Sequence, residues 1–417
     1  MRILQVVHQY PPERIGGTEL YTLALARGMT HRGHQVAVFH RAPGTPGLTP
    51  SDWQDMPTYR ACNGEMTSIS LYRSSFGDAA LSKAFARVVK DFEPDLIHLQ
   101  HLKGLPASIV RSARDERIPL VSTLHDYWTV CANAQLLTNY DQTICDGPRY
   151  GCTNCARCAV AMLDNPASAL ALPLLAALMT WRNFLLERAL HNVEVMIAPT
   201  EFVRRWFVTQ GWPEDRIEVI PHGIEPPTGD RGRNPGKDQR LHVVYIGGLA
   251  WQKGVHTLVE ACNGLHGVQL SIAGDEAFDR AYVSHLRSLA SPNVQFLGRL
   301  ERKEVWAALA QAGVVAVPSL WYETFSLILH EAFAAGTPVV ASDLGALSEA
   351  VRHGVDGWLV APGDVGAWRE TLGLLAEEPS LLSNARANIR PPMTQEDHLD
   401  RMEDIYSCAV ASHGGVQ

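Results

Sequence analysis

Two kinds of hydrophobic pattern alternate along this chain. Short and nearly unbroken apolar runs, such as residues 2–8 and 35–40, alternate with longer segments such as 18–33, where apolar positions recur every three or four residues. An unbroken apolar run predicts a strand that is covered on both faces of a sheet, and the wider spacing predicts a helix with one buried face. Strand, helix and strand in this order predict a parallel sheet with crossover helices.

The alternation forms two series, separated by a polar segment rich in proline and glycine at residues 226–240. Further strands of the first series are predicted at 95–100, 120–125 and 196–200. Those of the second series are predicted at 241–248, 268–275, 293–298, 313–319, 337–342 and 358–362. We therefore predict an α/β fold with two Rossmann-like domains that face each other across a central cleft. The first domain is expected to span residues 1–208, completed by a C-terminal helix within 395–417, and the second residues 209–394.

Composition limits the class of protein and its partners. The chain has 417 residues, of which 46% are hydrophobic, and a net charge of −8. That charge argues against nucleic acid as the main partner, and the oligomeric state is not predicted. The N-terminus lacks the ordered regions of a signal peptide, and no apolar run reaches the roughly 20 residues that span a bilayer. We expect a cytoplasmic protein with at most peripheral contact at the inner face of the membrane. The longest apolar run, 167–179, is better explained as a buried helix.

Residues 318–342 read as a strand end, a loop, a helix and another strand, with Glu323 in the loop and Glu331 on the helix. Eight residues of helix extend about 12 Å, which exceeds the roughly 9.5 Å between the carboxylates of a glycosidase. The pair therefore suits contacts with two distant parts of one ligand, such as the sugar and the ribose of a nucleotide sugar. The helix start favours an anion, and Thr324 and Ser326 are residue types that cap such a start.

Two glycine turns are further candidates for ligand contact. Gly16 and Gly17 precede the first helix, and Gly248 precedes Lys253, whose charge could balance a diphosphate. Neither turn completes a dinucleotide fingerprint, so ordinary turn chemistry and a solvated lysine remain open alternatives. His125 ends a predicted strand, where it would either face the cleft or be a satisfied core histidine.

Five of the eight cysteines lie within residues 131–158, a segment that reads as an insertion in the first domain. In a reducing compartment such a cluster favours a metal over disulfides. Four thiolates suit tetrahedral zinc, and we predict a structural site, with free or oxidised thiols as the alternative. The expected ligands are Cys131, Cys145, Cys155 and Cys158, with Cys152 able to replace Cys155.

Taken together, these motifs resemble glycosyltransferase family 4, the retaining, nucleotide-sugar-dependent enzymes of GT-B fold, over nearly the whole chain. The most specific match is the pair Glu323 and Glu331, seven residues between them, followed by AFAAGTPVVASDLG. RIEVIPHGIE, YIGGLAWQKGVHTLVEA and VQFLGRL also match. The motif HDYWTVC with its downstream cysteines resembles a subset with a Cys-rich insertion.

The resemblance implies roles for single residues. Glu323 would contact the donor sugar, Glu331 the ribose, and the backbone of residues 325–327 the phosphates. The implied catalytic residues are Glu323, Lys253 and His125. The implied donor-binding residues are Gly16, Gly17, Gly248, Phe296, Gly298, Arg299, Thr324, Phe325, Ser326, Leu327 and Glu331.

The resemblance also implies the reaction. A sugar would pass from a UDP-, GDP- or other nucleoside diphosphate sugar to a hydroxyl of a glycan, lipid-linked or small-molecule acceptor, without a catalytic cofactor. One departure is that Gly248 stands where many members have an arginine, for which Arg299 is a candidate replacement. A nucleotide-sugar epimerase of the same fold and a non-catalytic nucleotide-sugar-binding subunit are the alternatives.

Overall fold

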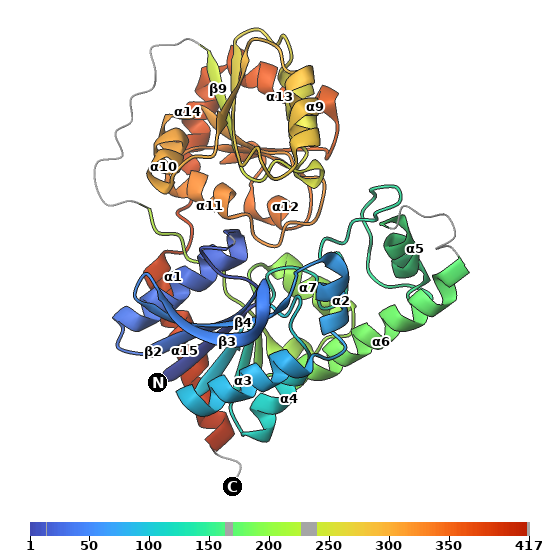
Figure 1. Ribbon diagram of the computed structural model, residues 1–417. Coiled ribbons are helices and arrows are strands. Elements are labelled where there is room, and N and C mark those ends of the chain that lie inside the picture. The colour runs from blue at the N-terminus through green and yellow to red at the C-terminus, as the bar shows by residue number, and fades with distance from the viewer. Residues whose placement is uncertain (14, 163–169, 227–239, 415–417) are drawn as a thin grey trace. The chain divides into compact units, whose positions relative to one another are not determined.

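The computed structural model describes residues 1–13, 15–162, 170–226 and 240–414, and it divides into two compact units. The first unit comprises Met1–Pro221 and Glu396–Gln417, and the second comprises His222–Gln395. Figure 1 shows a sheet with flanking helices in each unit. Most of the polar segment predicted at 226–240 lies outside the described residues.

The sheet of the first unit has eight strands in the order β3-β4-β2-β1-β5-β6-β7-β8. The strands are β1 (Arg2–Val7), β2 (Gln35–Ala42), β3 (Gly44–Trp53), β4 (Met56–Gly64), β5 (Leu96–Leu99), β6 (Leu120–Thr123), β7 (Val195–Ala198) and β8 (Ile217–Val219). All pairings are parallel except that of β3 with β4. The helices are α1 (Gly17–His31), α2 (Ser68–Ser74), α3 (Ala79–Phe92), α4 (Ser108–Asp115), α5 (Thr153–Ala161), α6 (Leu172–Leu190), α7 (Glu201–Thr209) and α15 (Gln395–Gly414).

The hydrophobic pattern missed the hairpin of β3 and β4. β3 is almost entirely exposed and rich in glycine, proline and threonine, so it carries no apolar run. Gln54 and Asp55 connect the two strands with φ angles of 50° and 65°, as a two-residue hairpin turn requires. Antiparallel pairing on an exposed edge therefore leaves little trace in the sequence.

The first unit ends later than the predicted boundary between residues 208 and 209. β8 follows that boundary and pairs in parallel with β7, so the chain remains in the first sheet up to Val219. α15 belongs to the same unit. Leu399 of α15 packs so closely on α1 that a Cβ at Gly28 would lie 2.5 Å from it, and the Tyr406 hydroxyl lies 2.7 Å from His98 Nδ1 in the sheet.

The second unit has six parallel strands in the order β11-β10-β9-β12-β13-β14. The strands are β9 (Leu241–Ile246), β10 (Val268–Ala273), β11 (Val294–Gly298), β12 (Val314–Val317), β13 (Val339–Ser342) and β14 (Gly357–Val360). The helices are α8 (Val255–Cys262), α9 (Arg280–Leu289), α10 (Arg302–Gln311), α11 (Leu327–Ala334), α12 (Ala346–Ala350), α13 (Val365–Glu377) and α14 (Pro379–Asn388). The strand order reverses between β9 and β12, which is where ligands bind in doubly wound sheets.

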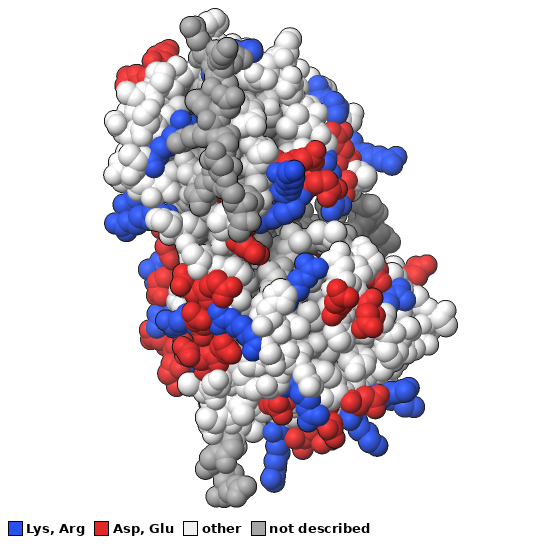
Figure 2. Space-filling model, turned by 90° about the vertical axis from the view of Figure 1, so that its left-hand side faces the viewer, with Lys and Arg blue, Asp and Glu red and all other residues white. Residues whose placement is uncertain are grey.

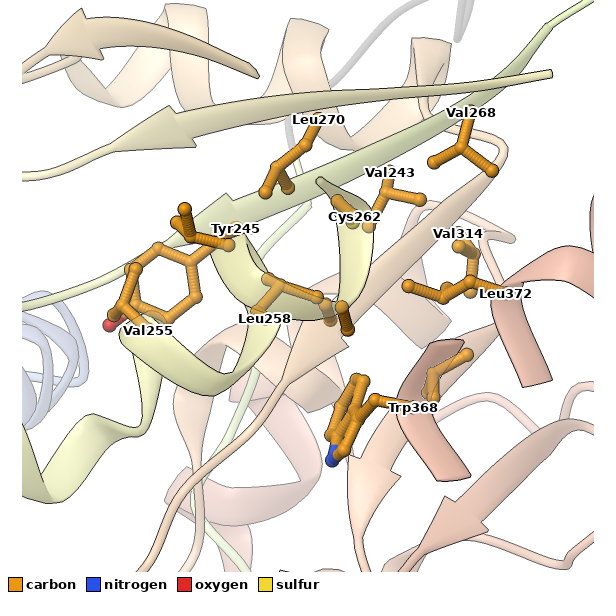
Figure 3. Close-up of a cluster of buried hydrophobic side chains, with 14 of the residues drawn as sticks. Val243, Tyr245, Val255, Leu258, Cys262, Val268, Leu270, Val314, Trp368 and Leu372 are labelled. Carbon is orange, nitrogen blue, oxygen red and sulfur yellow. The ribbon is translucent and has the colours of Figure 1, made fainter. Parts of the chain in front are cut away.

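Buried side chains hold the helices of the second unit against its sheet. Figure 3 shows Val243 and Leu270 of the strands beside Leu258 of α8 and Trp368 of α13. Trp368 is fully buried, and burial of a large aromatic side chain contributes about 3 kcal/mol or more. This packing fixes the start of α8, next to Lys253.

The apolar run at 167–179 is only partly buried where it is described, so the expectation of a buried helix is wrong for its outer face. Residues 167–169 lie outside the described residues. On α6, Leu174 is 64% exposed and Trp181 is 53% exposed. Ala176 and Met179 face the unit instead, because only one side of α6 packs against it. Among the helices that the structure describes, none is long and apolar enough to cross a membrane.

Charged side chains of both signs mix on the surface. Figure 2 shows acidic and basic residues interspersed on the face turned to the viewer. One such group joins α1 to α15, where Arg32 forms ion pairs with Glu396, Asp400 and Glu403. These pairs help to hold the C-terminal helix on the first unit.

Candidate active site

The start of α11 leaves several backbone amides without partners. Ser326 occupies the N-cap position in a left-handed conformation (φ 63°), and its side chain makes no capping hydrogen bond, contrary to expectation. The N–H groups of Phe325, Ser326, Leu327 and Ile328 donate to no group in the described part of the chain. Unpaired amides at the positive end of a helix form a binding site for an anion such as phosphate.

Glu323 is a buried carboxylate beside this helix start, only 8% exposed. Its Oε1 accepts hydrogen bonds from Lys253 Nζ at 2.7 Å, Ser319 Oγ at 2.7 Å and Trp321 Nε1 at 3.0 Å. Oε2 accepts none from the residues that the structure describes. One oxygen therefore anchors the carboxylate, and the other remains able to accept a hydroxyl of a ligand.

Lys253 is placed by the glycine that follows it. Gly254 has a φ of 67°, and a Cβ there would lie 1.9 Å from the carbonyl oxygen of Pro318. Only glycine permits both the left-handed conformation and this close approach. The turn after β9 thus packs on the loop after β12, and the Lys253 ammonium also lies 5.0 Å from the centre of the Trp321 ring.

Glu331 lies on α11 and is 7% exposed. Its Oε1 is 2.5 Å from Nη1 of Arg302, at the start of α10. Burial raises the pKa of Glu331, and the charge of Arg302 acts in the opposite direction. Arg302 carries no motif signal and was not predicted. The neighbouring Arg299, which was predicted, is exposed and makes no hydrogen bond or ion pair with a described residue.

Gly248, which stands where many family members have an arginine, has free space around it. A Cβ at Gly248 would meet nothing within 4 Å, and its φ is not in the left-handed region. The Gly248 carbonyl accepts a hydrogen bond from the Tyr245 hydroxyl at 2.7 Å, which holds the turn. A side chain at Gly248 would therefore fit without a clash.

Aromatic rings line the rest of the region around α11. Phe325 stacks on His330 with ring centroids 3.8 Å apart, and His222 packs on Phe325 at 4.8 Å. Burial lowers the pKa of His330 to about 4, so this ring is neutral near pH 7. At β11, the Arg287 guanidinium covers the half-buried Phe296 ring at 4.5 Å, and Gly298 follows with a φ of 69°.

In the first unit, His125 lies just after β6 and is held by the sheet. Gln100 donates from Nε2 to Gln5 Oε1 at 2.8 Å and lies 3.0 Å from His98 Nδ1. Its Oε1 therefore accepts from His125 Nε2, at 2.7 Å. Burial is the main cause that lowers the pKa of His125 to about 3. His125 is thus a neutral imidazole whose orientation Gln100 determines.

The contact between His101 and Asp126, near His125, was not predicted from the sequence. His101 Nδ1 accepts the backbone N–H of Lys103 at 2.9 Å, so its Nε2 carries the proton that bonds Asp126 Oδ2 at 2.7 Å. Burial acts to raise the pKa of Asp126, but the charge of His101 and its hydrogen bond act in the opposite direction. The pKa of this carboxyl therefore lies below its usual value. The HDYW motif contained Asp126, but its partner lies 25 residues earlier in the chain.

Gly16 and Gly17 begin α1, as predicted, with Gly16 as the N-cap. A Cβ at Gly16 would lie 2.7 Å from Oε2 of Glu19, so the glycine leaves room for that carboxylate at the helix start. Glu19 also lies 3.4 Å from His8 Nε2, at the end of β1. Gly16 therefore lies beside a charged group of the chain itself.

The cysteines of residues 131–158 are all free thiols. The neighbouring Cys155 thiol is the main cause that lowers the pKa of Cys152 to about 6. Cys158 accepts the backbone N–H of Asn139 at 3.5 Å. Within the described residues, no group of three or more histidine, cysteine or acidic side chains is arranged to hold a metal ion. The zinc site with Cys131 and Cys145 stays a prediction, which elemental analysis of the purified chain would test.

Comparison with known proteins identifies the family. The family model "Glycosyltransferase Family 4" matches residues 15–227, and "Glycosyl transferases group 1" matches residues 240–378. An uncharacterized glycosyltransferase of Methanocaldococcus jannaschii is 25% identical over 99% of this chain and 100% of its own length.

Solved structures share the fold. Sucrose-phosphate synthase from Thermosynechococcus elongatus has a TM-score of 0.72 at 20% identity, over 99% of both chains. Anabaena HepE, solved with UDP-glucose, has a TM-score of 0.68 at 19% identity, over 98% of this chain and 100% of HepE. The α/β class with two Rossmann-like units is confirmed. The chain belongs to glycosyltransferase family 4, whose members are retaining enzymes of GT-B fold that use nucleotide-sugar donors.

Proposed function

We propose that the second unit binds a nucleoside diphosphate sugar at the reversal of its strand order, between β9 and β12. The observation that supports this proposal is how the two carboxylate oxygens of Glu323 are hydrogen-bonded. Its Oε1 is anchored by Lys253, Ser319 and Trp321 while Oε2 is left for a ligand, next to the unpaired amides of α11. An acceptor for sugar hydroxyls and donors for phosphate oxygens thus occur side by side.

We further propose the roles of the groups in the reaction. The bond between the sugar C1 and the phosphate oxygen breaks, and a bond from C1 to the acceptor oxygen forms on the same face. Lys253 and the α11 amides stabilise the charge on the leaving phosphate, which takes the acceptor proton. Glu331 contacts the ribose, residues 296–298 border the base, and the neutral His125 contacts the donor sugar. No metal has a role in this scheme.

UDP-glucose is the first donor to test, because HepE was solved with it. A panel of UDP-, GDP- and ADP-sugars would be screened by thermal shift, since a bound ligand raises the melting temperature by mass action. We expect one class of donor to stabilise the wild-type chain and to stabilise a Glu323→Gln variant less. Product analysis would then follow nucleotide release and the anomeric configuration of the product. A chain that binds no nucleotide sugar at all would contradict the proposal.

A further inference from the structure

A polar cavity lies in the first unit, at the carboxyl ends of β2 and β4 and beside α2. Its volume is about 160 Å³, far above the roughly 10–15 Å³ that one water molecule needs. Its walls are polar and include Arg41, Asn63, Ser70, Arg73, Ser74 and Asp78. Arg73 and Gly77 are exposed, so the cavity opens to solvent.

Arg41 is a buried cation with neutral partners, only 1% exposed. Nη1 donates to the Gly104 carbonyl at 2.9 Å and to Ser74 Oγ at 3.1 Å, and Nη2 donates to Asn63 Oδ1 at 3.1 Å and to Ser70 Oγ at 3.4 Å. Its Nε is buried and has no hydrogen-bond partner. No ion pair joins Arg41 to a described carboxylate. A guanidinium stays protonated in proteins, and a buried charge without a counter-ion is costly, so the site favours an added anion.

The one carboxylate in the cavity wall already has other partners. Asp78 is the N-cap of α3 and accepts the backbone N–H of Leu81 at 3.0 Å and the side-chain amide of Asn63. Burial lowers the pKa of Arg41, and the charge of Asp78 partly offsets this effect. Arg73 adds a second guanidinium that forms no hydrogen bond or ion pair within the described residues. Two cations against one occupied carboxylate leave the cavity positive.

We propose that this cavity binds an oxyanion of the acceptor, a phosphate or carboxylate group, through Arg41 and Arg73. The Arg73 guanidinium, which has no partner among the described residues, can contact two oxygens of such a group at once, whereas Arg41 contributes its buried charge and the one N–H, on Nε, that has no partner there. The cavity lies at the carboxyl ends of parallel strands, where ligands of such sheets bind, in the unit expected to hold the acceptor. The link to the acceptor rests on the proposed function, whereas the anion site itself does not.

The test is a calorimetric titration of inorganic phosphate, and separately of acetate, into four proteins. These are the wild type, Arg73→Gln, Arg41→Gln and Arg111→Gln. Arg111 is an exposed arginine on α4 outside the cavity, so its variant controls for the loss of one surface charge. We expect Arg73→Gln to weaken binding of the preferred anion about tenfold or more and Arg111→Gln to leave it unchanged. Arg41→Gln should abolish binding.

Arg73 carries the test if Arg41→Gln fails to fold, because Arg73 has no structural partners to lose. A phosphate effect without an acetate effect identifies a phosphate site, and the reverse identifies a carboxylate site. Equal affinities of both anions for wild type and Arg73→Gln would overturn the proposal. Phosphate binding at the α11 amides does not depend on Arg73. It is therefore equal in the wild type and in Arg73→Gln and cancels when the two titrations are compared.

A parallel titration with UDP-glucose separates this proposal from the proposed function. Arg73→Gln should bind the nucleotide sugar as the wild type does. Donor binding without an Arg73-dependent anion site would defeat only the cavity proposal. An Arg73-dependent anion site in a chain that binds no nucleotide sugar would defeat only the proposed function. In transfer assays, Arg73→Gln should raise the KM of phosphorylated or carboxylated sugar acceptors about tenfold and leave that of neutral acceptors unchanged.

Discussion

The Lys253 ammonium lies 2.7 Å from Glu323 Oε1, although the two residues are 70 positions apart. Lys253 follows β9 and Glu323 follows β12, and these strands are neighbours at the point where the strand order reverses. Lys253, proposed to contact the phosphate, and Glu323, proposed to accept hydrogen bonds from the sugar hydroxyls, thus hold each other before a donor binds.

Lys253→Met removes the ammonium and keeps the apolar stem. If Lys253 stabilises the leaving phosphate, kcat for nucleotide release should fall about 100-fold, as when one preorganised donor is lost. Lys303→Met removes an exposed lysine of α10 and serves as the matched control. Steady-state assays measure both variants, and equal kcat values would exclude the assigned role.

Glu331→Gln should weaken the binding of the donor. A hydrogen bond to a charged group contributes about 1.5–3 kcal/mol, so the donor Kd should rise roughly tenfold or more. Arg302 loses its partner, but its side chain is 56% exposed and can be hydrated, so the melting temperature should change little. Calorimetric titration of the donor into this variant and into Glu377→Gln, an exposed control on α13, gives the comparison. A donor Kd equal to that of the control speaks against the ribose contact.

Gly248→Arg restores the cation that many family members have at this position. A Cβ added to Gly248 would have open space around it, so the variant should fold with an unchanged melting temperature. One more cation near the leaving phosphate should lower the donor Kd or raise kcat by about tenfold. Gly248→Gln has similar reach without the charge and should resemble the wild type. If arginine and glutamine behave alike, charge at this position does not limit the reaction.

Gly254→Ala should destabilise the second unit far more than Gly264→Ala. Both glycines have positive φ angles, of 67° and 60°, so alanine costs about 1–2 kcal/mol at each. Only at Gly254 would the new Cβ also collide with a backbone oxygen, that of Pro318. Thermal melting should show a loss at Gly254 at least twice that at Gly264. Donor binding should be lost only in Gly254→Ala, and equal melting temperatures would refute the close packing.

Stability should fall as the pH falls below about 6.5. Burial lowers the pKa of His125 to about 3 and those of His330 and His398 to about 4, so the folded state keeps these rings neutral. The unfolded chain takes up their protons below about 6.5, which favours unfolding by about 1.4 kcal/mol per pH unit for each ring. The stability is therefore present above pH 6.5 and is lost toward pH 4. Denaturant melts of the wild type and of His398→Gln, at several pH values, should show a shallower slope in the variant.

Much of the fold was readable from the chain because its strands are buried on both faces. Residues 2–8 and 241–248 are nearly unbroken apolar runs, and each contains a strand. The hairpin of β3 and β4 was missed because an exposed edge has no such pattern. The placement of the two units across a cleft stays a prediction.

The candidate site was readable only in part. Glu323, Glu331 and Lys253 stand in motifs whose spacing is local. Arg302 and Gln100 contact the predicted residues Glu331 and His125 from 29 and 25 positions away, and nothing near them in the chain marks these contacts. The uncapped Ser326 was also misjudged, because a serine at a helix start favours capping unless the backbone turns left-handed.

The sequence by itself determined the α/β alternation, the two series of strands, the family and the local motifs, since each depends on residues that are near one another in the chain. Tertiary structure alone decided which strands are neighbours, and hence that Lys253 bonds Glu323 and that Arg41 lies buried beside an open polar cavity. The physical reason is that strand order and side-chain burial result from packing over the whole sheet, which no local pattern encodes.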